Sequence, residues 1–372
     1  MRSFFLLALF FLIKASTNSH AQVANTGLMD TTTQNKIGKI SFGAYIDAYY
    51  GRTFNSLKNE DVPYMSNMTD NNNIGINLAY IDVRYQSERL RARFTPGYGS
   101  YVTVNYALEP LGFSNIIEAN VGLKLSKKKD IWLDFGVFGS PYTNESCISK
   151  DHLAYTRSLA PEYVPYYLAG AKLNYVLNSK WSFYLYVING WQQIKDLNQG
   201  KSVATQVEFR PSDKHLINWN TYVGDESSVI HPNYTTRYFS DLYWIYNPNG
   251  KLSMTACAYL GLQKKNTLGV SSSHLWWTAN YIARYYFNKT ASITGRVEYF
   301  SDPDQIMVTN AYSPALPFQC WSTSLGYNLK LWDQALFRIE ARQFFSDVNI
   351  FKTESGGSQS NTWITTNLTA WF

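Results

Sequence analysis

The feature that most constrains this chain is an alternation of apolar and polar side chains with a period of two residues. In residues 275–287, Leu275 and Trp277 fall on one face, while Thr278, Asn280 and Arg284 fall on the other. Consecutive residues of a β-strand point to opposite faces, so such a segment has one apolar and one polar face. The pattern predicts an all-β fold rather than helices.

The alternation recurs in about 16 segments. Single-chain bacterial barrels have an even number of strands, so this count is typical of a closed transmembrane barrel. The segments begin near Lys39, Asn73, Leu90, Ile116, Asp130, Tyr167, Lys180, Ser202, Lys214, Thr236, Lys251, His274, Thr290, Phe318, Gln334 and Asn361.

The connections between these segments alternate in length. The short ones have the composition of tight turns. Short periplasmic turns and long outer loops are typical of a transmembrane antiparallel β-barrel, the fold class that we expect here. The long connections are expected at residues 55–72, 139–166, 190–201, 225–235, 264–273, 302–317 and 346–360.

Composition separates this chain from other classes of protein. Charged residues make up 16% and aromatic residues 16%, whereas soluble domains carry about 25% charged residues. No apolar run after the first residues approaches the ~20 residues of a membrane-spanning helix. An Arg or Lys facing lipid at the bilayer midplane costs about 2–4 kcal/mol, so the alternating charges are expected to face a polar lumen.

The first residues have the order of a secretory signal peptide. Arg2 precedes an apolar run over residues 4–13, and small residues lead to a cut between Ala21 and Gln22. We therefore expect a signal peptide over residues 1–21, a short N-terminal segment over 22–38 and the barrel over 39–372. The three cysteines cannot all pair, so no disulfide framework is indicated.

The last segment alternates once more and ends in an aromatic residue. Ile364, Leu368 and Phe372 share one face of this segment. Such a carboxy-terminal strand looks like the signal recognised by the barrel-assembly machinery of Gram-negative outer membranes. An aromatic residue at the membrane interface is the simpler interpretation of Phe372.

Residues 135–194 contain short sequence motifs that are similar to those of a known family. They include Gly139-Ser140-Pro141, Tyr155-Thr156-Arg157-Ser158 and Asn189-Gly190-Trp191-Gln192. These phrases resemble the OmpL-like β-barrel porins, the porin-2 type of outer-membrane porins. The resemblance implies a barrel porin with no cofactor and no catalytic residues.

Several charged residues on the predicted inner face are candidates for lining a pore. A row of arginines would favour anions. Alternatively, Arg and Glu on neighbouring strands pair along the wall and stiffen it. The candidates are Arg84, Arg91, Arg93, Arg284, Arg296, Glu298, Arg338, Glu340 and Arg342.

The connection over residues 139–166 is long enough to suggest a function. It could fold into the barrel and narrow the pore, or form a lid outside, and the sequence leaves both open. If it folds inward, Tyr155, Arg157, Glu162 and Tyr163 are the candidates for a constriction.

Together these patterns predict an outer-membrane porin of a Gram-negative bacterium, a water-filled channel for passive diffusion of small hydrophilic solutes with a slight preference for anions. Its expected partners are outer-membrane lipid, the assembly machinery and small polar solutes. A homotrimer stays open. The chain has 33 Lys and Arg against 27 Asp and Glu, too small an excess to indicate a nucleic-acid partner.

Two alternatives differ in class. A barrel-anchored surface enzyme needs a nucleophile and a histidine at the outer rim, and the sequence identifies no such pair; His274 is assigned to the membrane interface. A structural or adhesive protein would have a plugged lumen and large repetitive outer loops. The scattered histidines show no metal-ligand spacing, so we expect no metal, no cofactor and no enzymatic activity.

Overall fold

The computed structural model describes residues 38–55, 60–248 and 250–372, and the statements below refer to these residues. The expected signal peptide over residues 1–21 and the following segment to residue 37 lie outside them. Within the described residues, no helix is long and apolar enough to cross a membrane.

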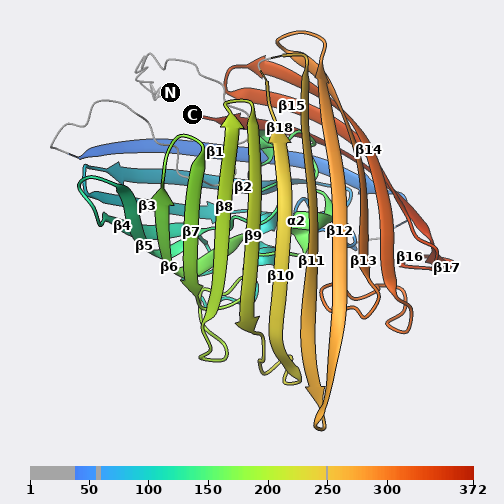
Figure 1. The fold of residues 1–372 in the computed structure, drawn as a ribbon. Helices are drawn as coiled ribbons and strands as arrows, with labels where there is room; N and C mark the ends of the chain where they lie inside the picture. Colours follow the sequence, from blue (N-terminus) through green and yellow to red (C-terminus); the bar gives the residue numbers. More distant parts are fainter. Residues whose placement is uncertain (1–37, 56–59, 249) are drawn as a thin grey trace, which may run out of the picture.

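The described chain forms a closed antiparallel barrel of 16 strands, as the alternation predicts (Figure 1). Each strand pairs with the next one along the chain, and β1 pairs with β18 to close the ring. The strands are β1 (Lys39–Thr53), β2 (Asn73–Gln86), β3 (Leu90–Tyr98), β4 (Ile116–Lys124), β5 (Asp130–Gly139), β6 (Tyr167–Val176), β7 (Trp181–Ile188), β8 (Ser202–Ser212), β9 (His215–Asp225), β10 (Tyr234–Tyr246), β11 (Leu252–Thr267), β12 (Val270–Tyr286), β13 (Ala291–Asp302), β14 (Phe318–Trp332), β15 (Ala335–Phe345) and β18 (Ser360–Trp371).

The barrel has one rim of short turns and one rim of longer loops, which we call the turn rim and the loop rim. The loop rim includes a connection with helix α1 (Ser100–Asn105), and the small hairpin of β16 (Phe351–Thr353) and β17 (Gly356–Ser358). Neither feature was expected, because α1 is short and the hairpin lies in a Gly- and Ser-rich stretch that carries no apolar alternation.

One expected long loop is wrong. Residues 264–273 continue β11 and β12, which meet in a tight turn at Leu268 and Gly269, with φ of 52° and 86°. Two positive φ angles suit a two-residue hairpin, and Gly269 adopts one without strain. The hairpin reaches beyond the neighbouring strands (Figure 1). The strand residues on its outer face, Lys264, Asn266, Ser271 and Ser273, are polar, so the apolar alternation ends before the strands do.

The faces of the strands follow the predicted alternation. On β12, Leu275, Trp277 and Tyr281 are exposed on the outside, while Thr278 and Arg284 are buried inside. The outer surface is therefore the apolar one, which suits contact with lipid, and the polar side chains are collected in the interior.

The carboxy terminus completes the ring. The backbone N–H of Phe372 donates to the carbonyl of Ala44 at 3.1 Å, and the N–H of Ala44 donates to the carbonyl of Phe372 at 3.2 Å. The Phe372 residue is 75% exposed. The last residue thus seals the first and last strands together while presenting an aromatic group outside.

Candidate functional site

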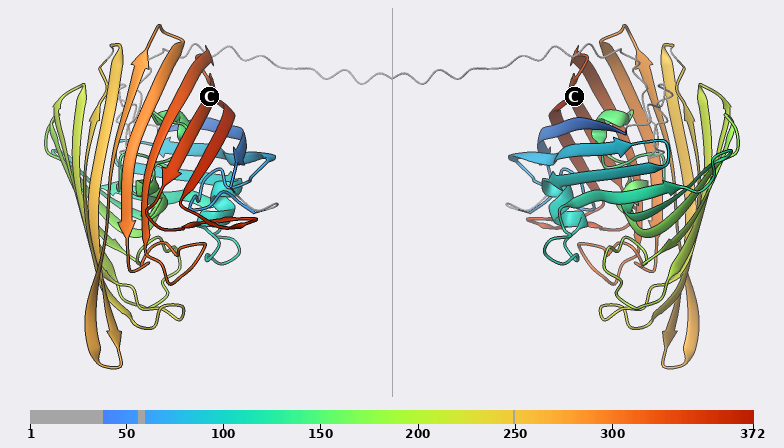
Figure 2. Two further views of the ribbon diagram at one scale, coloured as in Figure 1. Left: turned by 90° about the vertical axis from the view of Figure 1, so that its right-hand side faces the viewer. Right: turned by 90° about the vertical axis from the view of Figure 1, so that its left-hand side faces the viewer.

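The connection between β5 and β6, residues 140–166, lies inside the barrel; we call it the inner loop. It contains a 3₁₀ turn, η1 (Ser149–Asp151), and the short helix α2 (Leu159–Glu162), which contacts β11, β12 and β13. Figure 2 shows α2 enclosed by the strands. Tyr155 and Arg157 are at most 1% exposed. Of the two positions that the sequence left open, the structure has the inward one.

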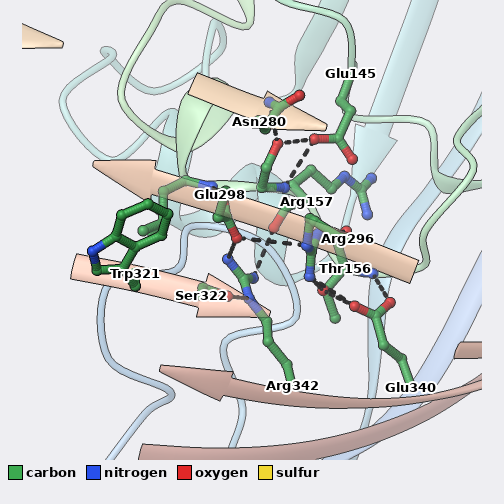
Figure 3. A network of polar contacts seen from close by, with 12 residues as sticks. Glu145, Thr156, Arg157, Asn280, Arg296, Glu298, Trp321, Ser322, Glu340 and Arg342 are labelled. Atoms are coloured by element: carbon green, nitrogen blue, oxygen red, sulfur yellow. Dashed lines mark hydrogen bonds and ion pairs between the residues drawn. The ribbon is translucent and has the colours of Figure 1, made fainter. Parts of the chain in front are cut away.

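An ion pair between Arg296 and Glu340 binds residues 155 and 156 in the middle of the inner loop (Figure 3). One carboxylate oxygen of Glu340 accepts the backbone N–H groups of Tyr155 and Thr156 at 2.8 and 2.9 Å, and the other accepts the Thr156 hydroxyl at 2.8 Å. Arg296 donates to the carbonyl of Thr156 at 2.6 Å. Backbone groups of the loop are thereby bound by charged groups of the wall.

A second ion pair, between Arg342 and Glu298, binds the next residues of the loop. Arg342 donates to the carbonyl of Arg157 at 2.8 Å, and Glu298 accepts the N–H of Leu159. The side chains of both wall residues are 0% exposed. Removing one partner of such a buried pair costs about 3–5 kcal/mol, so the inner loop is firmly held.

The remaining two arginine candidates of this wall bind residues 149 and 152 of the loop. Arg284 donates to the carbonyl of His152 at 2.8 Å, and Arg338 donates to the carbonyl of Ser149 at 2.7 Å. The guanidinium of Arg338 also lies 4.7 Å from the centre of the Tyr155 ring. The six candidates on β12, β13 and β15 therefore bind the loop with their polar groups.

The inner loop is also anchored by residues that the sequence analysis did not select. The carboxylate of Asp241 accepts the N–H of Thr143 at 2.6 Å, and Asn144 donates to Thr255 and Asn280 at 3.0 and 2.9 Å. The alternation places Asp241 and Asn280 inside the barrel. It does not indicate which inward residues meet the loop, so the sequence holds no signal for these contacts.

Three of the four constriction candidates point to different partners. The hydroxyl of Tyr155 donates to Asp47 at 3.4 Å. Arg157 donates to the carbonyl of Ser146 at 3.1 Å within the inner loop, and it also contacts the Met68 sulfur of the β1–β2 loop at 3.4 Å. The hydroxyl of Tyr163 donates to the carbonyl of Tyr64 at 3.0 Å, in the loop between β1 and β2.

The fourth candidate, Glu162, joins the inner loop to that same β1–β2 loop. Its carboxylate accepts the N–H of Ser66 at 2.6 Å and the side-chain amide of Asn67 at 3.1 Å. Burial raises the pKa of Glu162, and the hydrogen bonds from Ser66 oppose this. The two loops are thus joined inside the barrel, because a side chain of the inner loop accepts hydrogen bonds from the backbone and side chains of the β1–β2 loop.

The other three candidates, Arg84, Arg91 and Arg93, line the inner face of β2 and β3, away from the wall that binds the inner loop. Arg93 donates to Asp82 at 2.9 Å and also pairs with Glu118. These arginines therefore pair with acidic residues along the wall, which is the alternative to a row of unpaired arginines that the sequence analysis left open.

Three ion pairs on the wall formed by strands β2 to β8, which we call the β2–β8 wall, are not symmetric in exposure, whereas the pair of Lys124 and Asp130 is, at 20% and 21%. The side chains of Arg84, Arg91 and Arg210 are 44%, 24% and 36% exposed, whereas their partners Asp82, Asp134 and Glu208 are 9%, 2% and 3% exposed. Lys172 is 19% exposed and shares Asp134. The carboxylates lie beneath the basic groups, so the accessible face of this wall is positively charged.

The described residues contain no group of three or more His, Cys, Asp or Glu side chains that could hold a metal ion.

Comparison with known proteins now fixes the family. Residues 39–372 match the family model described as "Putative beta-barrel porin-2, OmpL-like". This chain belongs to that family. The porin's family and fold are those of a channel rather than an enzyme, and the resemblance noted in residues 135–194 is confirmed. No curated protein sequence matches the porin.

Solved structures share the porin's fold at low identity. The outer membrane channel DcaP of Acinetobacter baumannii has a TM-score of 0.61 at 8% identity, covering 91% of this chain and 99% of that one. An anion-selective porin from Comamonas acidovorans has a TM-score of 0.57 at 8% identity, covering 90% and 100%. The OmpT protein of Vibrio cholerae has a TM-score of 0.56 at 10% identity, covering 92% and 99%. These likenesses establish the fold.

Proposed function

We propose that this porin is a narrow, water-filled channel for passive diffusion of small hydrophilic solutes across the outer membrane of a Gram-negative bacterium, with a slight preference for anions. In this proposal the loop rim faces outward and the turn rim faces the periplasm. The channel runs between the inner loop and the β2–β8 wall. Lipid covers the apolar outer surface.

The position of the inner loop supports the proposal that the channel is narrow. Its backbone is bound by charged groups of β12, β13 and β15, so it occupies that side of the lumen. A segment fixed at so many points keeps its position during passage of a solute. The inner loop, including Tyr155, Arg157, Glu162 and Tyr163, is therefore proposed as the constriction.

The asymmetric exposure of the ion pairs is the observation that carries the anion preference. Arg84, Arg91 and Arg210 present more of their side chains than the carboxylates that they pair with. These arginines lie near the turn-rim ends of β2, β3 and β8. A solute in that part of the lumen meets more of the cationic side chains than of the carboxylates, which lowers the barrier for anions. The pairing also cancels much of the charge, so the preference is slight.

The remaining parts of the proposal concern export and assembly. Residues 1–21 are proposed to be a cleaved signal peptide, and the strand ending at Phe372 to be recognised by the barrel-assembly machinery. A homotrimer is proposed on the precedent of OmpT of Vibrio cholerae, which has a structure described as its trimer form. The mobility of unheated protein in denaturing gels, with and without cross-linking, measures this state.

The experiment that tests the proposal is recording from planar bilayers containing folded protein. We expect discrete conductance steps, and in a KCl gradient a reversal potential whose sign reports chloride as the more permeant ion. The absence of steps from inserted protein would contradict the channel. A cation-selective reversal potential would contradict the role of the β2–β8 wall.

A further inference from the structure

A serine, a histidine and an aspartate lie in line on the loop rim, outside the region of the proposed channel. The hydroxyl oxygen of Ser272 is 2.8 Å from Nε2 of His274. On the other side of the ring, Nδ1 of His274 is 3.1 Å from a carboxylate oxygen of Asp304. A nucleophile, a base and an acid in this order are the elements of a hydrolytic triad, which is recognised by geometry and not by sequence position.

The register of the sheet explains why these three residues meet. Ser272 and His274 are two residues apart on β12, so they share a face. The ladder between β12 and β13 ends with the pair Trp277 and Ser301. Continuing it by three residues places Asp304 opposite His274. The strand geometry therefore builds the arrangement, although the sequence separates its members by some 30 residues.

Asp304, the acidic residue of the three, lies in a turn that is held in place by hydrogen bonds. The carboxylate of Asp302 accepts the backbone N–H groups of Ile306, Met307 and Val308 at 2.9, 2.7 and 3.0 Å. Asp302 is fully buried. The turn that carries Asp304 is thus tied to the end of β13.

The site is open to solvent on its reactive side. Ser272 is exposed, the His274 side chain is 22% exposed, and that of Asp304 is 50% exposed. Nδ1 itself is buried, and its 3.1 Å contact with Asp304 is not a hydrogen bond. Because the Asp304 side chain is half exposed, its carboxylate is free of packing that would prevent it from turning toward Nδ1.

We propose that Ser272, His274 and Asp304 form a hydrolytic site for carboxylic esters at the loop rim. Ser272 is the nucleophile, His274 is the general base, and Asp304 orients the imidazole. This activity is separate from the channel and does not depend on it. The sequence analysis missed it because Ser272 is one of many serines and His274 was assigned to the membrane interface.

The surroundings of Ser272 indicate which esters fit. Lys265 is its cross-strand partner on β11, and directly opposed residues point to the same face. The Lys265 ammonium lies 5.0 Å from the centre of the Tyr234 ring. The Lys265 side chain thus shares a face with Ser272 and extends toward β10, and a cation on this face favours an ester that carries a negative group. The hairpin reaches past the neighbouring strands, so the substrate comes from the aqueous phase (Figure 1).

The proposed hydrolysis needs no co-reactant other than water. The Ser272 oxygen adds to the ester carbonyl carbon while its proton passes to Nε2 of His274. The carbon–oxygen bond to the alcohol then breaks, and His274 returns the proton to the departing alkoxide. Water repeats the sequence on the acyl-serine, releasing the carboxylic acid and restoring Ser272.

The test uses the folded full-length porin in detergent. A fluorophosphonate probe measures the nucleophile, and release of 4-nitrophenol from a neutral and a carboxylate-bearing 4-nitrophenyl ester measures turnover. We expect a single adduct on Ser272 and faster reaction of the carboxylate-bearing ester. Ser273→Ala is the matched control, because Ser273 is the next residue on the opposite face of the same strand.

The variants separate a catalytic from a structural role. Ser272→Ala should abolish labelling, and His274→Gln, which keeps a hydrogen-bonding side chain without a base, should slow it at least about 100-fold. Lys265→Gln should remove the preference for the carboxylate-bearing ester. Bilayer conductance should be the same in all of them. Absence of labelling in the wild type, labelling that survives Ser272→Ala, or a His274→Gln rate equal to that of the wild type would overturn the proposal.

Discussion

Arg296 on β13 and Glu340 on β15 form a 2.7 Å ion pair across the intervening strand β14, and both bind Thr156 of the inner loop. The pair connects three strands and a loop that enters from a distant part of the chain. Its geometry makes the position of residues 155 and 156 of the inner loop depend on the Glu340 carboxylate.

Glu340→Gln removes that carboxylate's charge. We expect it to weaken the hold on the inner loop by about 3–5 kcal/mol, because it leaves Arg296 buried with an incomplete partner. The inner loop should then become sensitive to protease, and the single-channel conductance should rise. Glu88→Gln, in an exposed turn, is the control. Unchanged conductance and protection in Glu340→Gln would show that the pair does not position the loop.

The exposed arginines of the β2–β8 wall are expected to set ion preference. Arg84→Gln and Arg210→Gln should each move the reversal potential in a KCl gradient toward zero, since the buried partners Asp82 and Glu208 lose their covering charge. High salt should shrink the effect, because exposed charges are screened. The exposed Lys214→Gln serves as the control. A shift in Lys214→Gln as large as in the wall variants would assign the preference to net charge alone.

The buried His152 of the inner loop is expected to make loop insertion sensitive to acid. Burial, together with Arg157, Arg338, Arg284 and Lys150, holds its pKa well below the usual value. Its Nε2 accepts the N–H of Ser146 at 2.8 Å, which a protonated ring cannot do. Because a released loop binds a proton that the inserted loop excludes, insertion loses stability as pH falls below about 6.5, by up to about 1.4 kcal/mol per pH unit.

The measurement is protease cleavage of the inner loop between pH 8 and pH 5. Glu145 and Glu162 act in the opposite sense, since burial raises their pKa values and acid favours their inserted forms. The difference between the wild type and His152→Gln isolates the histidine. Equal pH profiles for the two proteins would remove His152 from the account.

The terminal residue is expected to matter for assembly more than for stability of the finished barrel. Phe372→Ala should lower the yield of folded, heat-modifiable protein in the outer membrane. Leu368→Ala removes a comparable apolar group from the same outer face of β18 and is the control. Equal yields for the two variants would reduce Phe372 to an ordinary lipid contact.

The strands could be predicted because their signal is local. Each expected start lies within a few residues of the observed one, and the largest offset is at β12, which begins at Val270 instead of His274. The alternation ends where the outer face leaves the apolar belt, and β12 continues past this point through polar residues. Period-two reasoning therefore finds the membrane-facing part of a strand and misses its extension.

The interior could not be predicted because its contacts join distant residues. Thr156 and Glu340 are 184 residues apart, and an inward-facing carboxylate gives no indication of which loop it binds. The same limit applies to Asp304, which meets His274 only through the register of β12 and β13. The alternation indicates which face of the sheet a residue lies on. The path of a loop depends on hydrogen bonds between distant residues, and the sequence pattern does not indicate which residues these are.

The central claim is that the inner loop narrows the channel. It is tested most directly by replacing residues 144–160 with a short Gly-Ser linker and recording single-channel conductance from protein whose unheated gel mobility shows a folded barrel. We expect a severalfold larger conductance with weaker dependence on solute size. Conductance and size dependence equal to those of the wild type would contradict it.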